Sequence, residues 1–206
     1  DKEFKGANKM SSTVERVILA GFSGHGIFFM GNVLAEAGMR AGKNVSLVPS
    51  YSSEPKGGLI NCALLMSEKE IASPMITVPD TVIAMNRTSV NKFNQKIKGG
   101  GMLMYNSSLI DRQEFRDDIR LVEIPATEIA AELGEQKAAN MVMSGAYAKF
   151  SKLVTVEEIE NSIRYLLRDE NKEVIELNIE AVKKGYDYVE EKKYMFGRYV
   201  HSVFRV

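Results

Sequence analysis

Three glycines follow an apolar run near the start of the chain, in a pattern that can bind an anion. The sequence reads Gly21-Phe-Ser-Gly-His-Gly26 and then passes into a helical pattern. A strand that runs into a helix through such a loop leaves backbone N–H groups unpaired at the helix N-terminus. The order Gly-x-x-Gly-x-Gly differs from the Gly-x-Gly-x-x-Gly of dinucleotide sites. The loop is therefore either a phosphate or pyrophosphate site or a tight turn that needs only the conformational freedom of glycine.

A second polar segment, residues 49–58, lies between two apolar runs. It carries a phenol (Tyr51), a carboxylate (Glu54) and a cation (Lys56), and it ends in Gly57 and Gly58. Because parallel strands bring their carboxyl ends to one edge of a sheet, we expect this segment to emerge beside the first glycine loop. The two loops then share a crevice, unless the second is only a solvated connector.

The sequence offers no recognisable metal site and no catalytic set. It has two histidines, His25 and His201, and one cysteine, Cys62, without a Cys-x-x-Cys or His-x-x-x-His pair. Cys62 stands in an apolar run and is expected to be a small buried residue of a strand. One cysteine cannot hold an iron–sulfur cluster, so any redox centre must belong to a partner.

Composition narrows the class of protein further. The 206 residues are 45% hydrophobic, and 27 Lys and Arg balance 27 Asp and Glu. This length allows a full core, while zero net charge gives no footprint for nucleic acid and favours association with other proteins, including self-association of the isolated chain. No apolar run approaches the roughly 20 residues of a membrane span, and no signal segment opens the chain. We expect a soluble, cytoplasmic protein.

Apolar periodicity predicts the elements that position these loops. Strands are expected at 16–21, 45–48, 59–66, 80–86, 102–105 and 119–124, with 71–74 as a short edge piece in a hairpin with 59–66. Helices are expected at 27–41, 86–97, 127–133, 138–149, 156–167 and 171–191. Gly42 is expected to end the first helix in the left-handed conformation, and Gly31 to let that helix approach the sheet closely. Asn86 or Thr88 can cap the second helix.

This order predicts an α/β fold, a Rossmann-like doubly wound, mostly parallel sheet followed by a C-terminal helical segment. Residues 1–14 are expected to be disordered, 15–168 to form the α/β domain, and 169–206 to form a helix and a partner-binding tail. The tail from 192 onward has basic but no acidic residues, which suits an arm lying on a partner or a disordered end.

Several motifs in order resemble the gamma subunit of the 2-oxoacid:ferredoxin oxidoreductases. They are Gly-Phe-Ser-Gly-His-Gly at 21–26, Pro-Ser-Tyr-Ser-Ser-Glu-Pro-Lys-Gly-Gly at 49–58, Asn61-Cys62, Ile71-Ala-Ser-Pro74, Pro79-Asp80 and Ala84-Met-Asn86. Ser23 and His25 depart from the family's usual Gly-x-Gly-Gly-Gln-Gly, and Lys56 stands where the family usually has Arg. The second loop is most similar to the 2-oxoglutarate type, and next to the branched-chain type.

The resemblance implies a complex that decarboxylates a 2-oxoacid oxidatively, forms an acyl-CoA and reduces ferredoxin. Thiamine diphosphate, magnesium and iron–sulfur clusters are then expected on alpha, beta and delta-type partner subunits. For this chain we expect a supporting role, with a crevice for coenzyme A or substrate. The residues expected to line it are Gly21, Ser23, Gly24, His25, Gly26, Tyr51, Glu54, Lys56, Gly57 and Gly58.

Two other classes of function stay open. A nicotinamide- or flavin-binding reductase needs an acidic ribose ligand near the second strand, but residues 45–49 read Val-Ser-Leu-Val-Pro. A structural assembly subunit with an empty crevice is compatible with the same motifs.

Overall fold

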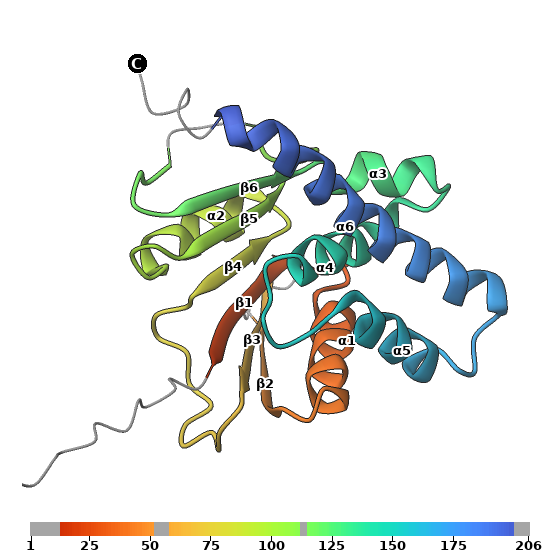
Figure 1. Ribbon diagram of the computed structural model, residues 1–206, viewed down its shortest axis with the longest axis horizontal. Helices are drawn as coiled ribbons and strands as arrows, with labels where there is room; N and C mark the ends of the chain where they lie inside the picture. The colour runs from red at the N-terminus through yellow and green to blue at the C-terminus, as the bar shows by residue number, and fades with distance from the viewer. Residues whose placement is uncertain (1–12, 52–57, 112–114, 200–206) are drawn as a thin grey trace, which may run out of the picture.

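A six-stranded sheet with the order β2-β3-β1-β4-β5-β6 lies at the centre of the protein (Figure 1). The computed structural model describes residues 13–51, 58–111 and 115–199, and side chains as far as 189. The strands are β1 (Val14–Phe22), β2 (Asn44–Tyr51), β3 (Leu59–Ser67), β4 (Thr81–Ala84), β5 (Met102–Asn106) and β6 (Arg120–Ile124). β1, β4, β5 and β6 are mutually parallel. The predicted α/β fold with a mostly parallel sheet is confirmed.

Strand β3 is where the sheet departs from simple β-α-β order. It runs antiparallel to both neighbours, with Ser67 opposite Val14 of β1 and opposite Asn44 of β2. The expected hairpin between 59–66 and 71–74 is wrong, because 71–74 forms no strand. That segment ends in Pro74, which has no N–H to give to a sheet. Two reversals leave β2 running in the same direction as β1, so their carboxyl ends reach the same edge.

Helices cover both faces of the sheet. They are α1 (Ile27–Arg40), α2 (Arg87–Phe93), α3 (Ala126–Glu132), α4 (Ala139–Ala148), α5 (Val156–Leu166) and α6 (Lys172–Tyr199). One buried cluster joins α1, α3, α4, α5 and α6 to one face, and a smaller one joins α2 to the other (Figure 1). The second expected helix is shorter than 86–97, because a 3₁₀ turn (Asn94–Lys96) follows α2. The last one is longer than expected, so 192–199 belongs to α6, whereas 200–206 lies outside the described residues.

Helix α4 forms the centre of the helical layer. All ten of its residues are buried, and it crosses α6 at two glycines. A Cβ atom on Gly145 would lie 1.8 Å from the Val182 carbonyl oxygen, and one on Gly185 would lie 1.9 Å from the Val142 carbonyl oxygen. The two helix backbones therefore touch, and neither position accepts a side chain at this separation.

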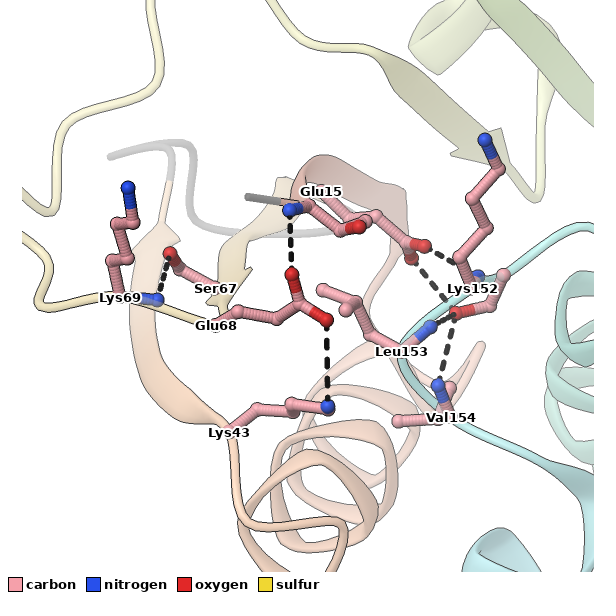
Figure 2. Close-up of polar contacts among 10 residues, drawn as sticks. Glu15, Lys43, Ser67, Glu68, Lys69, Lys152, Leu153 and Val154 are labelled. Carbon is pink, nitrogen blue, oxygen red and sulfur yellow. Dashed lines mark hydrogen bonds and ion pairs between the residues drawn. The ribbon is translucent and has the colours of Figure 1, made fainter. Parts of the chain in front are cut away.

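A polar network ties the amino end of β1 to the segment between α4 and α5 (Figure 2). Glu15 accepts hydrogen bonds from the Tyr147 hydroxyl, from the Ser151 hydroxyl at 2.8 Å and from the Lys152 N–H at 2.6 Å. Burial, and then the charge of Glu15, raises the pKa of Tyr147 well above its ordinary value. The tyrosine stays protonated and donates to the carboxylate.

Candidate functional site

The glycine loop connects β1 to α1 through two positive backbone angles. Gly24 has φ +95° and Gly26, the N-cap of α1, has φ +66°. Residues that carry a Cβ atom rarely adopt a positive φ, so glycine is favoured at both positions of this sharp turn. Gly21 is restricted differently, since a Cβ atom there would lie 2.8 Å from the Ile27 side chain. Ser23 and Gly24 are exposed at the tip of the loop.

The backbone amides of this loop divide into paired and unpaired groups. The His25 N–H donates to the Phe22 carbonyl at 3.1 Å, and the Met30 N–H makes the first helical bond, to Gly26, at 2.9 Å. Within the described residues, no acceptor pairs with the N–H groups of Gly24, Gly26 or residues 27–29. Since the His25 amide is engaged, the donors available to an anion are those of the two glycines and of the first turn of α1.

The charge distribution at this end of α1 also suits an anion. The 14-residue helix directs the positive end of its dipole at the loop, and its first turn carries no acidic side chain. Among the residues that the structure describes, no side chain caps the helix N-terminus. A phosphate group would supply both the missing acceptors and the missing negative charge.

The side chain of His25 folds back onto its own loop. Its Nδ1 accepts a hydrogen bond from the Phe22 N–H at 3.3 Å, and the two rings lie 5.8 Å apart. Burial lowers the pKa of His25 below its ordinary value of 6.5. The imidazole is therefore neutral near pH 7, with Nδ1 as the acceptor and the proton on Nε2.

Asn140 of α4 holds the loop from a distant part of the chain, and sequence reasoning missed it. Its Nδ2 donates to the Gly26 carbonyl at 3.1 Å, and its Oδ1 accepts the Met141 N–H at 2.9 Å. A Cβ atom on Gly26 would lie 2.2 Å from that Nδ2. A separation of 114 residues leaves no local signal in the sequence for this contact.

Both described ends of the second polar segment, residues 49–58, lie beside the glycine loop. This is the position that was predicted from the shared edge of the sheet. Phe22 pairs with Leu59, which places Gly58 at the level of Ser23. Tyr51, 70% exposed, packs against Phe28 of α1, with the ring centroids 4.8 Å apart and the ring planes tilted by 55°. Tyr51, Gly58 and the glycine loop therefore share one edge. Glu54, Lys56 and Gly57 lie outside the described residues.

Next to the loop on its other side is a topological switch point. β1 and β4 are adjacent and parallel, yet α1 follows on one face of the sheet and α2 on the other. In open α/β sheets, the crevice that binds ligands lies outside the carboxyl ends of such a strand pair. Asn86, the N-cap of α2, stands at this position, and its Oδ1 accepts the Ser89 N–H at 2.8 Å. The expected cap is confirmed as Asn86 rather than Thr88.

Cys62 is a core residue, as expected. It is fully buried in β3 against α1, and burial raises its thiol pKa to about 11. Gly31 eases the approach of α1 to the sheet, because a Cβ atom there would lie 3.2 Å from the Leu47 side chain of β2. In the described ranges, no group of three or more His, Cys, Asp or Glu residues could hold a metal ion. No described helix is long and apolar enough to cross a membrane.

Sequence comparisons place the chain among oxidoreductases. Residues 16–188 match the family described as pyruvate ferredoxin/flavodoxin oxidoreductase. The ketoisovalerate oxidoreductase subunit VorA of Methanothermobacter marburgensis is 32% identical over 174 residues, 84% of this chain and 36% of the relative. The 2-oxoglutarate synthase subunit KorC of Methanocaldococcus jannaschii is 29% identical over 180 residues, 86% of this chain and 95% of the relative. The chain thus spans about a third of VorA and nearly all of KorC.

Solved structures share the fold. The 2-oxoglutarate:ferredoxin oxidoreductase from Magnetococcus marinus, with 2-oxoglutarate, coenzyme A and succinyl-CoA bound, matches with a TM-score of 0.80 at 24% identity, over 86% of this chain and 31% of that chain. The gamma subunit of a keto/oxoacid ferredoxin oxidoreductase from Geobacter sulfurreducens matches with a TM-score of 0.71 at 23% identity, over 84% of this chain and 96% of that chain.

Proposed function

Because this chain belongs to the pyruvate ferredoxin/flavodoxin oxidoreductase family, we propose that it is the gamma-type subunit of a 2-oxoacid:ferredoxin oxidoreductase. The family resemblance found in the sequence motifs is confirmed by this match. The observation that carries the proposal is the match over residues 16–188, which contains the whole glycine loop. The reaction is the oxidative decarboxylation of a 2-oxoacid to an acyl-CoA, with reduction of ferredoxin.

For the chain itself we propose that the glycine loop binds the phosphate-bearing part of coenzyme A. The residues present fit that group, since Gly24, Gly26 and the first turn of α1 offer N–H donors without acceptors in the described part of the chain. The Ser23 hydroxyl is exposed beside them. The Magnetococcus marinus relative was solved with coenzyme A and succinyl-CoA bound, which supports this choice of ligand.

Tyr51, Glu54 and Lys56 complete the proposed crevice. Tyr51 and Gly58 reach the glycine loop from the second segment, and Lys56 carries a positive charge that can meet a phosphate or the substrate carboxylate. Glu54 orients Lys56 or pairs with a cation of a partner subunit. These three side chains act in binding, and none of them is assigned a bond-breaking step.

The proposal places thiamine diphosphate, magnesium and the iron–sulfur clusters on alpha, beta and delta-type partner subunits. Thiamine diphosphate supplies the decarboxylation chemistry when bound there, and the clusters pass electrons to ferredoxin. Of the chains that resemble this one, some are named for 2-oxoglutarate and others for ketoisovalerate. We propose 2-oxoglutarate as the substrate and ketoisovalerate as the first alternative, in a cytoplasmic complex.

A structural assembly subunit is the second candidate, and one observation favours it. The loop is stabilised within the chain by His25 and Asn140, so it keeps its shape without a ligand. A nucleotide-binding reductase is disfavoured, because β2 carries no Asp or Glu for a ribose.

The first experiment is co-expression of this chain with the subunits encoded beside it, followed by purification through a tag on this chain. We expect an iron–sulfur-coloured complex that reduces viologen when given coenzyme A and 2-oxoglutarate. Ketoisovalerate and pyruvate, assayed in parallel, rank the substrates. A chain that purifies alone and colourless from every such co-expression contradicts the proposed complex.

A matched pair of loop variants tests the coenzyme A role. No described residue lies within 4 Å of a Cβ atom on Gly24, and Asn and Asp tolerate its positive φ better than other residues with side chains. Gly24→Asn and Gly24→Asp differ only in charge, and the carboxylate would repel a phosphate. We expect the KM for coenzyme A to be about tenfold or more higher in Gly24→Asp than in Gly24→Asn, with the KM for the oxoacid equal. Equal KM values for coenzyme A favour the assembly role.

A further inference from the structure

Asn86 stands at the switch point beside the glycine loop. The Met85 N–H donates to the Ala20 carbonyl at 2.8 Å, which continues the parallel pairing of β4 with β1 beyond Ala84. Ala84 of β4 pairs with Ala20 of β1. Asn86 lies two residues after Ala84, and Phe22 lies two residues after Ala20. The backbone of Asn86 is therefore level with Phe22, where the glycine loop begins, and its side chain is 6% exposed.

Only half of this buried amide has a partner. The oxygen accepts from the Ser89 N–H at 2.8 Å and from the Ser89 hydroxyl at 2.9 Å. The nitrogen, Nδ2, is fully buried and has no hydrogen-bond partner among the described residues. Buried polar groups are nearly always paired, so an unpaired donor calls for a physical reason.

Capping α2 does not require this donor. Ser, Thr or Asp would accept the same backbone N–H and would leave no NH₂ group unpaired. Asparagine is a good N-cap in itself, but its buried Nδ2 costs stability unless it has an acceptor beyond those that the described residues offer. The two atoms of the planar amide diverge, so the nitrogen points away from the Ser89 contact that holds the oxygen.

We propose that the Nδ2 of Asn86 donates a hydrogen bond to a phosphate oxygen of the ligand bound at the glycine loop. This inference rests on the proposed coenzyme A function and extends the crevice from Ser23 and Gly24 across β1 to the end of β4. Asn86 is then a binding residue that adds a neutral, directional donor to the backbone amides of α1. Ligand binding would then pair a donor that has no partner in the described part of the chain.

The test measures coenzyme A binding to the purified complex by isothermal titration calorimetry, with inorganic pyrophosphate as a competitor. Asn86→Ser and Asn86→Asp both keep an oxygen to cap α2, and both lose the NH₂ group. We expect Asn86→Ser to weaken coenzyme A binding about 10-fold and Asn86→Asp to weaken it more, since a carboxylate repels phosphate. Pyrophosphate should compete with coenzyme A less well in both variants.

Asn94 provides a matched control at the opposite end of α2. It too has a buried side-chain atom, Oδ1, without a partner in the described part of the chain. Asn94→Ser should leave coenzyme A binding unchanged. Equal losses for the Asn86 and Asn94 variants overturn the inference, because they indicate a general effect on α2.

The Gly24 pair separates this inference from the proposed function. If Gly24→Asp weakens coenzyme A binding relative to Gly24→Asn and the Asn86 variants bind like the wild type, the inference is overturned while the function stands. If neither the Gly24 pair nor the Asn86 variants change binding, both are overturned.

Discussion

The polar groups at the two ends of the sheet differ in whether they are hydrogen-bonded within the described part of the chain. At the amino end, Glu15 accepts one hydrogen bond from Tyr147 of α4 and two from the segment that follows α4, at Ser151 and Lys152. Figure 2 shows how Glu15 lies beside this segment. At the carboxyl end, the amides of Gly24, Gly26 and residues 27–29 have no acceptor within the described residues, and the Nδ2 of Asn86 has none either. Both ends belong to the same sheet, so the difference lies in the side chains and loops at each end and not in the strands.

Stability and the proposed ligand binding are therefore expected to depend on opposite ends of the sheet. A polar group paired within the chain stabilises the folded state, whereas an unpaired donor costs stability unless a ligand supplies its acceptor. Substitutions at the amino end should therefore change unfolding more than binding. Substitutions at the carboxyl end should change binding more than unfolding, except where they remove the contacts that shape the loop.

The largest loss of stability is expected for Glu15→Ala. The variant leaves the buried Tyr147 hydroxyl and the Ser151 hydroxyl without their carboxylate acceptor. We expect the free energy of unfolding to fall by about 3 kcal/mol, measured by urea denaturation.

Glu68→Ala is the control at the same end of the sheet. Glu68 is partly exposed, lies 3.9 Å from the Lys43 ammonium and accepts the Thr13 N–H at 2.8 Å (Figure 2). Exposed ion pairs contribute little, so the loss should stay below about 1 kcal/mol. Equal losses in Glu15→Ala and Glu68→Ala would contradict the view that the buried network anchors β1.

The next largest effect is expected for Gly26→Ala in the glycine loop. The new methyl group would sit at φ +66° and 2.2 Å from the Asn140 Nδ2, so it strains the backbone and displaces the contact to α4. We expect a loss of about 2 kcal/mol in urea denaturation. Gly24→Ala is the control, because its φ of +95° is strained but no described atom lies within 4 Å of the new methyl group. It should lose only about 1 kcal/mol, and a larger loss there would mean that Asn140 does not hold the loop.

The sequence predicted the elements that follow from local patterns. The glycines at 24, 26 and 42 adopt the positive φ values that turns require, and Gly31 eases the approach of α1 to the sheet. The apolar runs became strands within a few residues of their expected bounds, although β1 begins at Val14, inside the segment expected to be disordered.

Contacts between distant segments could not be predicted in the same way. Whether β3 pairs with β2 and β1 or with 71–74 depends on tertiary packing, and apolar alternation does not distinguish these partners. Asn140 looks like an ordinary helix residue until the fold brings it to the Gly26 carbonyl. Asn86 could be predicted as a helix cap, but the pairing of β4 with β1, which sets its backbone level with Phe22, could not. Gly145 was expected in a helix, but its role at the α4–α6 crossing depends on Gly185, 40 positions further along the chain.

The smallest effect is expected from the titration of His25. Burial lowers its pKa in the folded chain below the ordinary 6.5, while the unfolded chain keeps the ordinary value. As the pH falls through 6.5 toward the folded pKa, the unfolded state binds more protons, and the stability decreases. Protonation of Nδ1 also removes the acceptor of the Phe22 N–H. Wild type should therefore lose stability between pH 7 and pH 5, by less than about 1 kcal/mol from this group.

His25→Gln separates this titration from every other group of the chain. Glutamine does not titrate, and its side-chain oxygen can accept the same backbone N–H. The urea midpoint of His25→Gln should therefore change less between pH 7 and pH 5 than that of the wild type, because all other titrating groups are common to both chains. Parallel pH profiles would mean that His25 is protonated equally easily in the folded and unfolded chains. The Nδ1 contact would then not shape the loop, and the contrast between the two ends of the sheet would rest on the backbone amides and Asn86 alone.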